Sequence, residues 1–577
     1  MKRKLLSACL ALCLICSLLL SGCGQEFTVS LNANYPGSGD LDAVTVKSGQ
    51  TVSAADPSRE GYVFDGWYTD ANLTEAWDIG TDKVKSDLNL YAAWDRDTGD
   101  TIQEPGNDKD FSKLRTPGSQ EEAYEYAAFF LPAVDGTSQP YVGDTMPYYE
   151  DGVYYIYYLK EAGDSYNHSV YLATTTDFLS YTEYDEPILE ASRSGGQDSW
   201  IGTGSVVKVD GKYYFFYTGH GNASVLEYAE KVMVAVGDTP TSFEKRTDWE
   251  ITPPSSLGQK NDFRDPQAYV DPNTGNIILT ITAAQDGVAR LLKYTLSPDL
   301  ETATYDGIIF TDPTGDFWNL ECSDTFKIGD TWYISYSGQD DTLWYASSDA
   351  PYGPYGEPTR LDDKLFYAAK HVEDGEKTYM VGWARRSESV SSTQDVAAWA
   401  GNLAVQEIIQ LDDGTLILDP VDSIAESYSV RRALAVDSSH IFLESGSLYS
   451  YTDAFTCYES FMLSGEFTFT GTGSFGLSFD YNGRADKNKL ISISPANNTL
   501  SLSFNQGSTP ITETAVDLTP GESYSFTYIQ EGSVGIFYID GMASLTVRIY
   551  GASGKTIQLF AENNAVQFTS LREYTKP

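Results

Sequence analysis

A hairpin pattern that recurs five times between residues 135 and 425 constrains the fold more than any other feature of this chain. In each copy a short strand-like run ends at a glycine, and a second, more aromatic or apolar run follows. The five glycines lie 59, 64, 54 and 46 residues apart, at Gly152, Gly211, Gly275, Gly329 and Gly375. Hairpins repeated at such intervals are typical of a five-bladed β-propeller, in which the innermost strand of every blade lines one central channel.

Composition agrees with an all-β fold of several domains. The chain has 577 residues, too many for one ordinary domain, and it contains 41 Tyr and 49 Gly without a long amphipathic helical pattern. We predict the propeller over residues 112–427 and a β-sandwich over residues 428–577. The clearest strands of the sandwich are predicted at Glu466–Phe469, Phe475–Phe479, Leu500–Phe504 and Gly535–Ile539.

The part that precedes the propeller divides into a small β unit and a linker. Alternating strand patterns at Phe27–Leu31, Leu41–Val46, Gly61–Tyr68 and Leu88–Trp94 predict a β-grasp-like module over residues 26–94. This segment is similar to the internalin-type B-repeat, a surface module, which implies a spacer or adhesive role. Residues 95–111 are polar and interrupted by Gly and Pro, so we interpret them as a linker.

Residues 1–22 have the features of an export signal. Three basic residues at positions 2–4 precede the apolar run Leu5–Leu20, which is short for a membrane span. The sequence Leu20-Ser21-Gly22-Cys23 resembles the bacterial lipoprotein box, which implies that Cys23 is acylated and anchors the protein to the extracellular face of the cell membrane. The alternative is an ordinary secretory signal with an incidental cysteine.

Charge and cysteine content narrow the possible partners. The chain carries 82 acidic and 38 basic residues, a formal charge of −44, so nucleic acids and anionic lipid heads are poor partners, whereas a neutral carbohydrate is not repelled. Beyond the signal and Cys23 only Cys322 and Cys457 remain, which excludes a disulfide framework. The four histidines are scattered, and no Cys/His cluster has the spacing of metal ligands, so we expect no metal and no cofactor.

Three acidic side chains, Asp144, Asp265 and Glu321, stand where the first strands of three different repeats begin. Because the first strands line the channel of a propeller, we expect these three carboxylates to meet at one mouth of it. Cleavage of a glycosidic bond needs such a set, with one carboxylic acid near the leaving oxygen and one carboxylate facing the anomeric carbon. Taken singly, each residue has an ordinary explanation as a turn cap or a surface ion pair.

The neighbours of these residues suggest separate roles. Gly143 leaves room for a substrate to approach Asp144, the candidate carboxylate. Glu321, the candidate acid, follows the apolar residues 317, 318 and 320, which we expect to desolvate it. Arg264 precedes Asp265 and would hold it ionised, which suits Asp265 to binding sugar hydroxyls.

The ordered set Asp144, Arg264-Asp265-Pro266 and Glu321-Cys322 resembles glycoside hydrolase family 32, the β-fructofuranosidases. The resemblance covers roughly residues 135–575, and it extends to Thr203-Gly204-Ser205 and to Trp399-Ala400-Gly401-Asn402. It implies a retaining double displacement with Asp144 as nucleophile, Glu321 as general acid/base and Asp265 as stabiliser of the transition state. Further expected contacts to the sugar are made by Arg264, Thr203, Ser205, Trp200 and Trp318, with Trp344 and Trp383 as other candidate aromatic platforms.

One departure from the family leaves the substrate open. The first family motif usually reads Trp-x-Asn-Asp-Pro-Asn-Gly, whereas this chain has Tyr141-Val142-Gly143-Asp144-Thr145-Met146-Pro147, without either asparagine. We therefore keep two alternatives to a fructan hydrolase. One is a propeller glycosidase of the family 43 type, acting on arabinose or xylose linkages, and the other is a non-catalytic fructan-binding lipoprotein.

Overall fold

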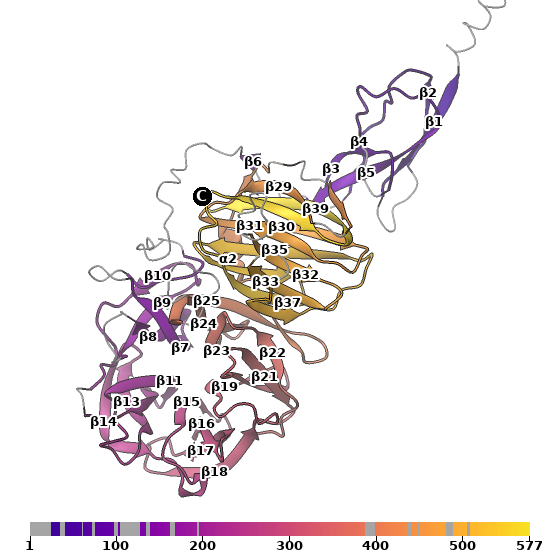
Figure 1. Cartoon of the computed structure of the whole chain (residues 1–577). Coiled ribbons are helices and arrows are strands. Elements are labelled where there is room, and N and C mark those ends of the chain that lie inside the picture. Colours follow the sequence, from indigo (N-terminus) through magenta and orange to yellow (C-terminus); the bar gives the residue numbers. More distant parts are fainter. Residues whose placement is uncertain are drawn as a thin grey trace, which may run out of the picture.

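The computed structural model is built almost entirely of β-sheets (Figure 1). The residues that it describes are 25–34, 41–59, 62–71, 76–96, 102–103, 127–133, 139–161, 168–192, 195–386, 398–434, 436, 440–446, 449–479, 488–504 and 508–577. Within these ranges no helix is both long enough and apolar enough to cross a membrane. The predicted signal (residues 1–22) and Cys23 lie outside the described residues.

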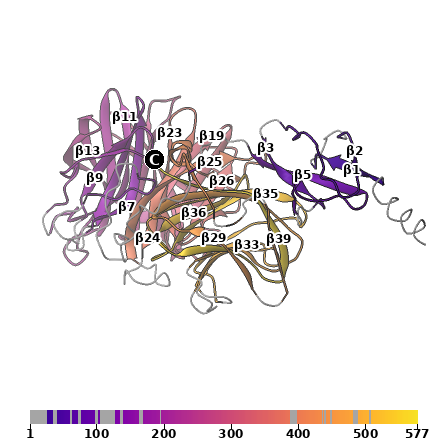
Figure 2. The same cartoon turned by 90° about the horizontal axis from the view of Figure 1, so that it is seen from above.

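A five-stranded sheet near the N-terminus projects away from the rest of the molecule in both views (Figures 1 and 2). Its strand order is β2-β1-β5-β3-β4, with β1 and β5 parallel. The strands are β1 (Glu26–Asn32), β2 (Val44–Lys47), β3 (Tyr62–Tyr68), β4 (Ala76–Trp77) and β5 (Leu88–Arg96). Buried Trp67 and Trp94 fill its core, and the Trp94 indole donates a hydrogen bond to the Ala33 carbonyl over 2.7 Å. The strands predicted at Phe27–Leu31 and Leu88–Trp94 are confirmed.

Four sheets surround a common centre at the opposite end of the molecule (Figure 1). One is eight-stranded and contains β7 (Tyr141–Glu150), β8 (Val153–Glu161), β9 (Val170–Thr175), β10 (Tyr181–Glu183), β23 (Phe366–Glu373), β24 (Thr378–Arg386), β25 (Ala398–Gln410) and β26 (Leu416–Asp419). The other three are four-stranded. They contain β11 (Trp200–Val209), β12 (Lys212–His220), β13 (Glu230–Thr239) and β14 (Ser242–Ile251); β15 (Phe263–Val270), β16 (Ile277–Gln285), β17 (Val288–Leu296) and β18 (Ala303–Thr311); and β19 (Glu321–Ile328), β20 (Thr331–Ser337), β21 (Leu343–Ser348) and β22 (Thr359–Asp362).

The strands β7, β11, β15, β19 and β23 form the inner wall of this ring. Each contacts the next in this order, and β23 contacts β7, so the ring is closed. Each of them also leads into the next strand of its sheet through one of the five glycines that mark the sequence repeat, and all five glycines have positive φ angles of 58–92°. Glycine reaches this region without steric cost, which explains why it recurs there. The five hairpins predicted from the sequence are confirmed.

The ring closes through the segment Trp399–Asn402 in β25. Gly401 pairs with Val142 of β7 and, on its other side, with Arg385 of β24, so β25 joins the first and last parts of the ring into the eight-stranded sheet. A Cβ atom at position 401 would lie 1.7 Å from the Ala384 carbonyl oxygen, so only glycine fits this crossing.

Two further sheets pack face to face in the C-terminal part. The six-stranded sheet contains β29 (Ser450–Thr456), β31 (Phe475–Phe479), β32 (Lys489–Ser494), β33 (Thr499–Phe504), β34 (Thr512–Ala515) and β38 (Thr556–Ala561). The eight-stranded sheet contains β6 (Ile102–Gln103), β27 (Val430–Arg432), β28 (His440–Ser445), β30 (Ser460–Phe469), β35 (Ser523–Glu531), β36 (Val534–Ile539), β37 (Ala543–Arg548) and β39 (Asn564–Thr575). Phe467 and Phe475 meet between the sheets with ring centroids 5.2 Å apart, as in a β-sandwich. β6 lies inside the segment that we predicted as linker and pairs in parallel with β27.

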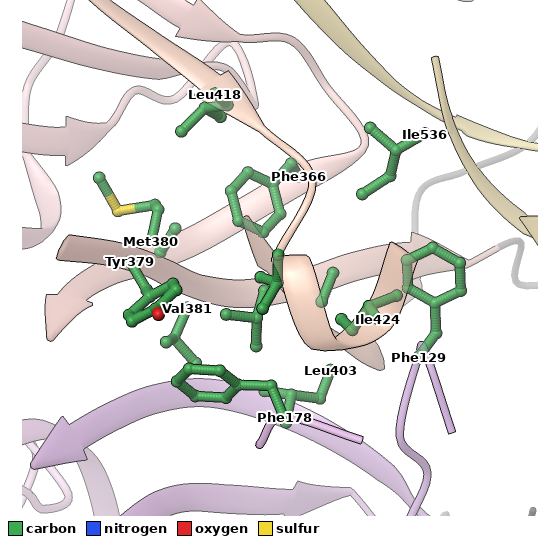
Figure 3. Close-up of a cluster of buried hydrophobic side chains, with 14 of the residues drawn as sticks. Phe129, Phe178, Phe366, Tyr379, Met380, Val381, Leu403, Leu418, Ile424 and Ile536 are labelled. Atoms are coloured by element: carbon green, nitrogen blue, oxygen red, sulfur yellow. The ribbon is translucent and has the colours of Figure 1, made fainter. Parts of the chain in front are cut away.

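The ring and the sandwich share one hydrophobic cluster (Figure 3). Ile536 of β36 belongs to the same buried set as Phe366 of β23 and Ile424 of the short helix α2 (Asp422–Ser427). Nearby, the buried guanidinium group of Arg548 donates hydrogen bonds to the Ala384 carbonyl (2.9 Å) and to Oδ1 of Asn402 (2.8 Å). Since the sandwich packs on the closing strands, it supports the ring where its two ends meet.

Candidate active site

The pairing of all five inner strands is irregular at the same place, close to the start of each strand. The breaks in register fall between residues 142 and 145 of β7, 202 and 204 of β11, 264 and 267 of β15, 321 and 324 of β19, and 367 and 370 of β23. Bulges of this kind redirect side chains and are frequent beside active sites. The residues at these breaks include Asp144, Thr203, Asp265, Cys322 and Ala368.

Three of these residues have unusual backbone angles. Asp265, Cys322 and Ala368 have φ values of 56°, 51° and 51°, in the left-handed region that residues with a Cβ atom rarely adopt. Such strained positions concentrate at functional sites, because the surrounding structure has to hold them. The irregular pairing therefore marks the end of the ring at which the predicted carboxylates lie.

Asp144 has a hydrogen-bond donor on each of its two oxygens. The Thr203 hydroxyl donates to Oδ2 over 3.1 Å, and the Trp383 indole nitrogen donates to Oδ1 over 3.2 Å. Burial raises the pKa of Asp144, and the charge of Glu321 raises it further, while the two hydrogen bonds oppose the rise. The influence of Glu321 shows that the two predicted catalytic carboxyl groups share one electrostatic environment.

Asp265 is buried, with 4% of its surface exposed, and it is fixed from two sides. The Cys322 N–H donates to its Oδ2 over 2.7 Å, and its own N–H donates to the Thr218 hydroxyl over 2.8 Å. The Cys322 sulfur also lies 3.3 Å from the Thr203 hydroxyl that binds Asp144, so a short network joins the two aspartates. Burial raises the pKa of Asp265 to about 6, although Arg264, the Cys322 N–H and Lys370 lower it.

Glu321 is held by the residues at the equivalent positions of the two neighbouring inner strands. Nη2 of Arg264 donates to Oε1 over 3.0 Å, and the Tyr367 hydroxyl donates to Oε2. We expected Arg264 to bind Asp265, but in the described part of the chain its side-chain hydrogen bonds go to Glu321, Glu230 (3.3 Å) and Asp262 (3.4 Å). The two neighbours differ in burial, since Asp265 is buried, whereas Arg264 and its partner Glu321 are partly exposed.

Glu230 is a further part of this arrangement. Burial by itself would raise the pKa of Glu230, but His220, the Arg264 guanidinium and the Phe263 N–H lower it to about 2. A second anion beside Arg264 holds the guanidinium group between Glu230 and Glu321, so its direction is fixed before any ligand binds.

Gly143 has a different role from the one that we predicted. A Cβ atom at this position would lie 2.2 Å from the Trp399 ring. The glycine therefore admits the Trp399 ring, and the prediction that it leaves room for substrate is corrected on this point. Trp399 in turn stacks on His168 (centroids 4.3 Å apart), and His168 lies parallel to Trp200 (6.3 Å).

The remaining predicted contact residues lie on the same strands or loops but differ in accessibility. Trp200 and Trp318 are 45% and 44% exposed, and the Arg264 guanidinium carbon lies 5.3 Å from the Trp318 ring centroid. Ser205 is buried, and its hydroxyl donates to the Pro266 carbonyl (3.0 Å) and accepts from the Ala268 N–H (2.8 Å). Ser205 thus fixes the bulge of β15. We interpret its predicted role in sugar binding as indirect, through the position of this bulge.

Tyr367 and Glu230 were missed in the sequence, and Trp383 was noted only as a stacking platform. A signal for Tyr367 existed: it precedes its hairpin glycine, Gly375, by eight residues, as Glu321 precedes Gly329. No comparable spacing marks Glu230, which belongs to the third strand of its sheet. In the part of the chain that the structure describes, no group of three His, Cys, Asp or Glu residues could hold a metal ion.

Comparison with known families matches this region to the N-terminal domain of glycosyl hydrolases family 32, over residues 144–420. Residues 144–420 are a family 32 glycosyl hydrolase domain. The match begins at Asp144 within β7 and ends one residue after β26, so it contains most of β7 and the whole of the other four inner strands. Residues 27–93 match a second family, the Listeria-Bacteroides repeat domain, which agrees with the repeat predicted at residues 26–94.

Relatives of the family 32 domain are distant. A sucrose-6-phosphate hydrolase from Escherichia coli is 25% identical over 277 residues, which are 43% of this chain and 55% of that protein. The N-terminal repeat is 42% identical over 72 residues to a putative Gly-rich membrane protein from Evansella cellulosilytica, covering 12% of this chain and 8% of that protein. The chain thus spans about half or less of the length of these curated relatives.

Solved structures share the fold over most of the chain. Fructan 1-exohydrolase IIa from Cichorium intybus superposes with a TM-score of 0.62 at 16% identity, covering 79% of this chain and 98% of that one. At this identity the likeness concerns the fold. It supports the predicted order of a propeller followed by a β-sandwich.

Proposed function

We propose that this protein is a retaining glycoside hydrolase that cleaves β-fructofuranosidic linkages in fructans or sucrose-like sugars. The observation that carries the proposal is the arrangement of two carboxyl groups at the breaks of β7 and β19, each bound by two donors, with a third, buried carboxyl group, Asp265, bonded to the N–H of Cys322 next to Glu321. The match of residues 144–420 to the family 32 domain supports the proposal. The strongly negative charge of the chain also agrees with it, because a neutral sugar is not repelled.

In the proposed reaction the Asp144 carboxylate attacks the anomeric carbon of the fructosyl unit. The bond from this carbon to the leaving oxygen breaks, and Glu321 gives its proton to that oxygen. In the second step Glu321 takes a proton from water, whose oxygen attacks the anomeric carbon and releases Asp144. Retention by this route needs carboxyl groups about 5 to 5.5 Å apart.

The fixed groups around these carboxyls supply the rest of the chemistry. We propose that Thr203 and Trp383 keep the Asp144 carboxylate directed at the anomeric carbon, and that Asp265 binds fructose hydroxyls and stabilises positive charge on the ring. Arg264 and Tyr367 orient Glu321 toward the leaving oxygen. Trp200 and Trp318, both exposed, are proposed stacking surfaces for the sugar.

The test is incubation of the full chain with sucrose, inulin, levan and arabinoxylan, followed by analysis of the products. We expect fructose or short fructans from at least one of the first three, with loss of turnover in Asp144→Ala and Glu321→Ala. Release of pentose alone would favour the family 43 type of activity. Binding of fructan with no turnover in the unchanged protein would favour the non-catalytic alternative.

We further propose a domain plan and a location. The eight-stranded sheet is counted as two blades joined at Gly401 and Val142, which makes five blades within residues 112–427, followed by the sandwich at 428–577. The β-grasp-like module at 26–94 and the linker at 95–111 would hold the enzyme away from a membrane to which Cys23 is attached by lipid, at the extracellular face. Incorporation of labelled palmitate in the unchanged chain and its absence in Cys23→Ala would support this anchor, and labelling of both would contradict it.

A further inference from the structure

A separate cavity of about 410 Å³ lies between the outer end of β18 and the sheet β19–β22. This volume is within the range of about 300 to 1,000 Å³ that is common for small-molecule sites. We call it the Tyr336 pocket, and its lining residues are Asp312, Thr314, Asp316, Phe317, Tyr336, Gln339, Asp340, Trp344, Glu357 and Pro358. Two loops build it: residues 312–320, which lead into Glu321, and residues 338–342, which join β20 to β21.

Two hydrogen-bond donors in this pocket are buried without a partner. The Tyr336 hydroxyl and the Gln339 amide nitrogen make no hydrogen bond with any residue that the structure describes, and Tyr336 is only 1% exposed. Burial raises the pKa of Tyr336, and the charges of Asp312 and Asp340 raise it further, so the hydroxyl keeps its proton. A buried donor without an acceptor is costly, and in a native protein it calls for a specific explanation.

The other polar groups of the pocket are carboxylates. Asp312 and Asp340 accept hydrogen bonds within their own loops, while Asp316 and Glu357 are exposed at the rim. None of the lining residues is basic. An anion would be repelled here, and a simple cation would offer no acceptor to the Tyr336 and Gln339 donors. A neutral polyhydroxylated ligand satisfies both kinds of group, because each hydroxyl can accept and donate.

Gln339, which contributes one of the two donors of the pocket, also contacts the segment that leads to the candidate active site. The side-chain oxygen Oε1 of Gln339 accepts hydrogen bonds from the backbone N–H groups of Trp318 and Asn319, both at 3.1 Å. The exposed Trp318 ring, in turn, lies against Arg264. The loop that carries Trp318 thus joins the Tyr336 pocket to the candidate active site.

We propose that the Tyr336 pocket binds a further sugar residue of the oligofructan that is being cleaved. Tyr336 and Gln339 donate to its oxygens, and Phe317, Trp344 and Pro358 contact its apolar face. This identification of the occupant rests on the proposed function, whereas the chemistry of the pocket does not.

Tyr336→Phe tests the proposal with little disturbance of the fold. The change removes the unpartnered hydroxyl and keeps the ring, which packs on Phe310 and Phe317 with centroids 6.0 and 6.5 Å away. Since no hydrogen bond within the described chain is lost, we expect an unchanged or higher melting temperature. The matched control is Tyr333→Phe on the same strand, whose hydroxyl is bonded to the Gly414 carbonyl (2.8 Å) and to Gln410 (2.6 Å).

The measurement is calorimetric titration of the full chain carrying Glu321→Gln, so that the ligand is not consumed. The ligands are sucrose, inulin-type oligofructans of increasing length, and xylo-oligosaccharides. We expect Tyr336→Phe to weaken the binding of long oligofructans about three- to tenfold more than that of sucrose. Tyr333→Phe should lower the melting temperature and leave both affinities as they were.

The outcomes separate this proposal from the proposed function. If the unchanged enzyme hydrolyses fructans but Tyr336→Phe binds and cleaves every chain length as the unchanged protein does, the pocket proposal is wrong and the function stands. If oligofructans bind through Tyr336 but no linkage is cleaved, the pocket proposal stands and the function is wrong. Tyr336-dependent binding of xylo-oligosaccharides alone would overturn the named occupant.

Discussion

The indole nitrogen of Trp383 donates a hydrogen bond to Oδ1 of Asp144 over 3.2 Å. Trp383 is almost fully buried on β24, so the direction of this bond is fixed by the packing of the ring. If Asp144 acts as the proposed nucleophile, it loses little freedom when substrate binds, because its carboxylate is already held in place.

Replacement of Trp383 by Phe is therefore expected to reduce kcat by about tenfold or more, in line with the loss of a hydrogen bond to a charged group. Because this bond lowers the pKa of Asp144, its removal should move the acidic limb of the pH–rate profile to higher pH. Trp249→Phe, which removes an indole bond to the Leu300 carbonyl outside the site, is the control. An unchanged acidic limb in Trp383→Phe would contradict the role given to this bond.

Tyr367→Phe should also lower kcat, by about tenfold to a hundredfold, with a smaller change in KM. The reason is that Glu321 loses the donor on Oε2 and is oriented by Arg264 alone. Tyr154→Phe removes a similar tyrosine–carboxylate bond, to Asp374 (2.6 Å), at a distance from the site in sequence and in sheet position. Steady-state kinetics of both variants should show the loss only for Tyr367.

Gly143→Ala should lower both stability and activity. The new methyl group meets the Trp399 ring, and overpacking of this kind costs about 1 to 3 kcal/mol. Gly356→Ala is the matched control, because the nearest atom to its added Cβ is 3.7 Å away. Chemical denaturation measures the difference, and equal free energies of unfolding for the two variants would show that β7 and Trp399 adjust without cost.

Asp362 and Asp324 should affect the pH dependence of stability in opposite directions. Burial raises the pKa of Asp362 to about 7 in the folded protein, so the folded state binds its proton more tightly than the unfolded state does. Its contribution to stability is fully present below the usual aspartate range and is lost as the pH rises from about 4 to about 7. Asp362→Asn should remove this decline, which would amount to about 4 kcal/mol.

Asp324 provides the contrast. Burial alone would raise the pKa of Asp324, but the contact of its Oδ2 with Nδ1 of His371 (2.6 Å) and further donors lower it. Its contribution is present above the usual aspartate range and is lost as the pH falls below it. Asp324→Asn should therefore make the stability less dependent on pH on the acidic side. Since burial lowers the pKa of His371 but Asp324 raises it above its usual range, the variant should lose part of the pH dependence above the usual histidine range as well. Unfolding curves between pH 3 and pH 8 would test both variants together.

The sequence allowed the ring and the carboxyl residues to be predicted because both leave regular marks. The turn glycines have a steric reason to recur, and Asp144, Asp265 and Glu321 stand eight to ten residues before them. Contacts between strands leave no such mark. The spacing marks the position of Tyr367, but its bond to Glu321, and the covering of Gly143 by Trp399, depend on which side chains the bulges bring together. The direction of Arg264 was mispredicted for the same reason, since neighbours in sequence differ in burial at this bulge.

The breaks in register of the five inner strands affect which amino-acid substitutions such a protein can accept. Below the breaks the hydrogen-bonded pairs run on regularly, so the strands are held together by backbone groups that do not depend on the side chains above. Substitutions among the residues at the breaks can therefore alter which sugar is accepted while the sheets keep their alignment. Of the two positions at which the family motif has asparagine, Gly143 lies at such a break, whereas Met146 is buried and pairs with Tyr157 in the regular part of β7.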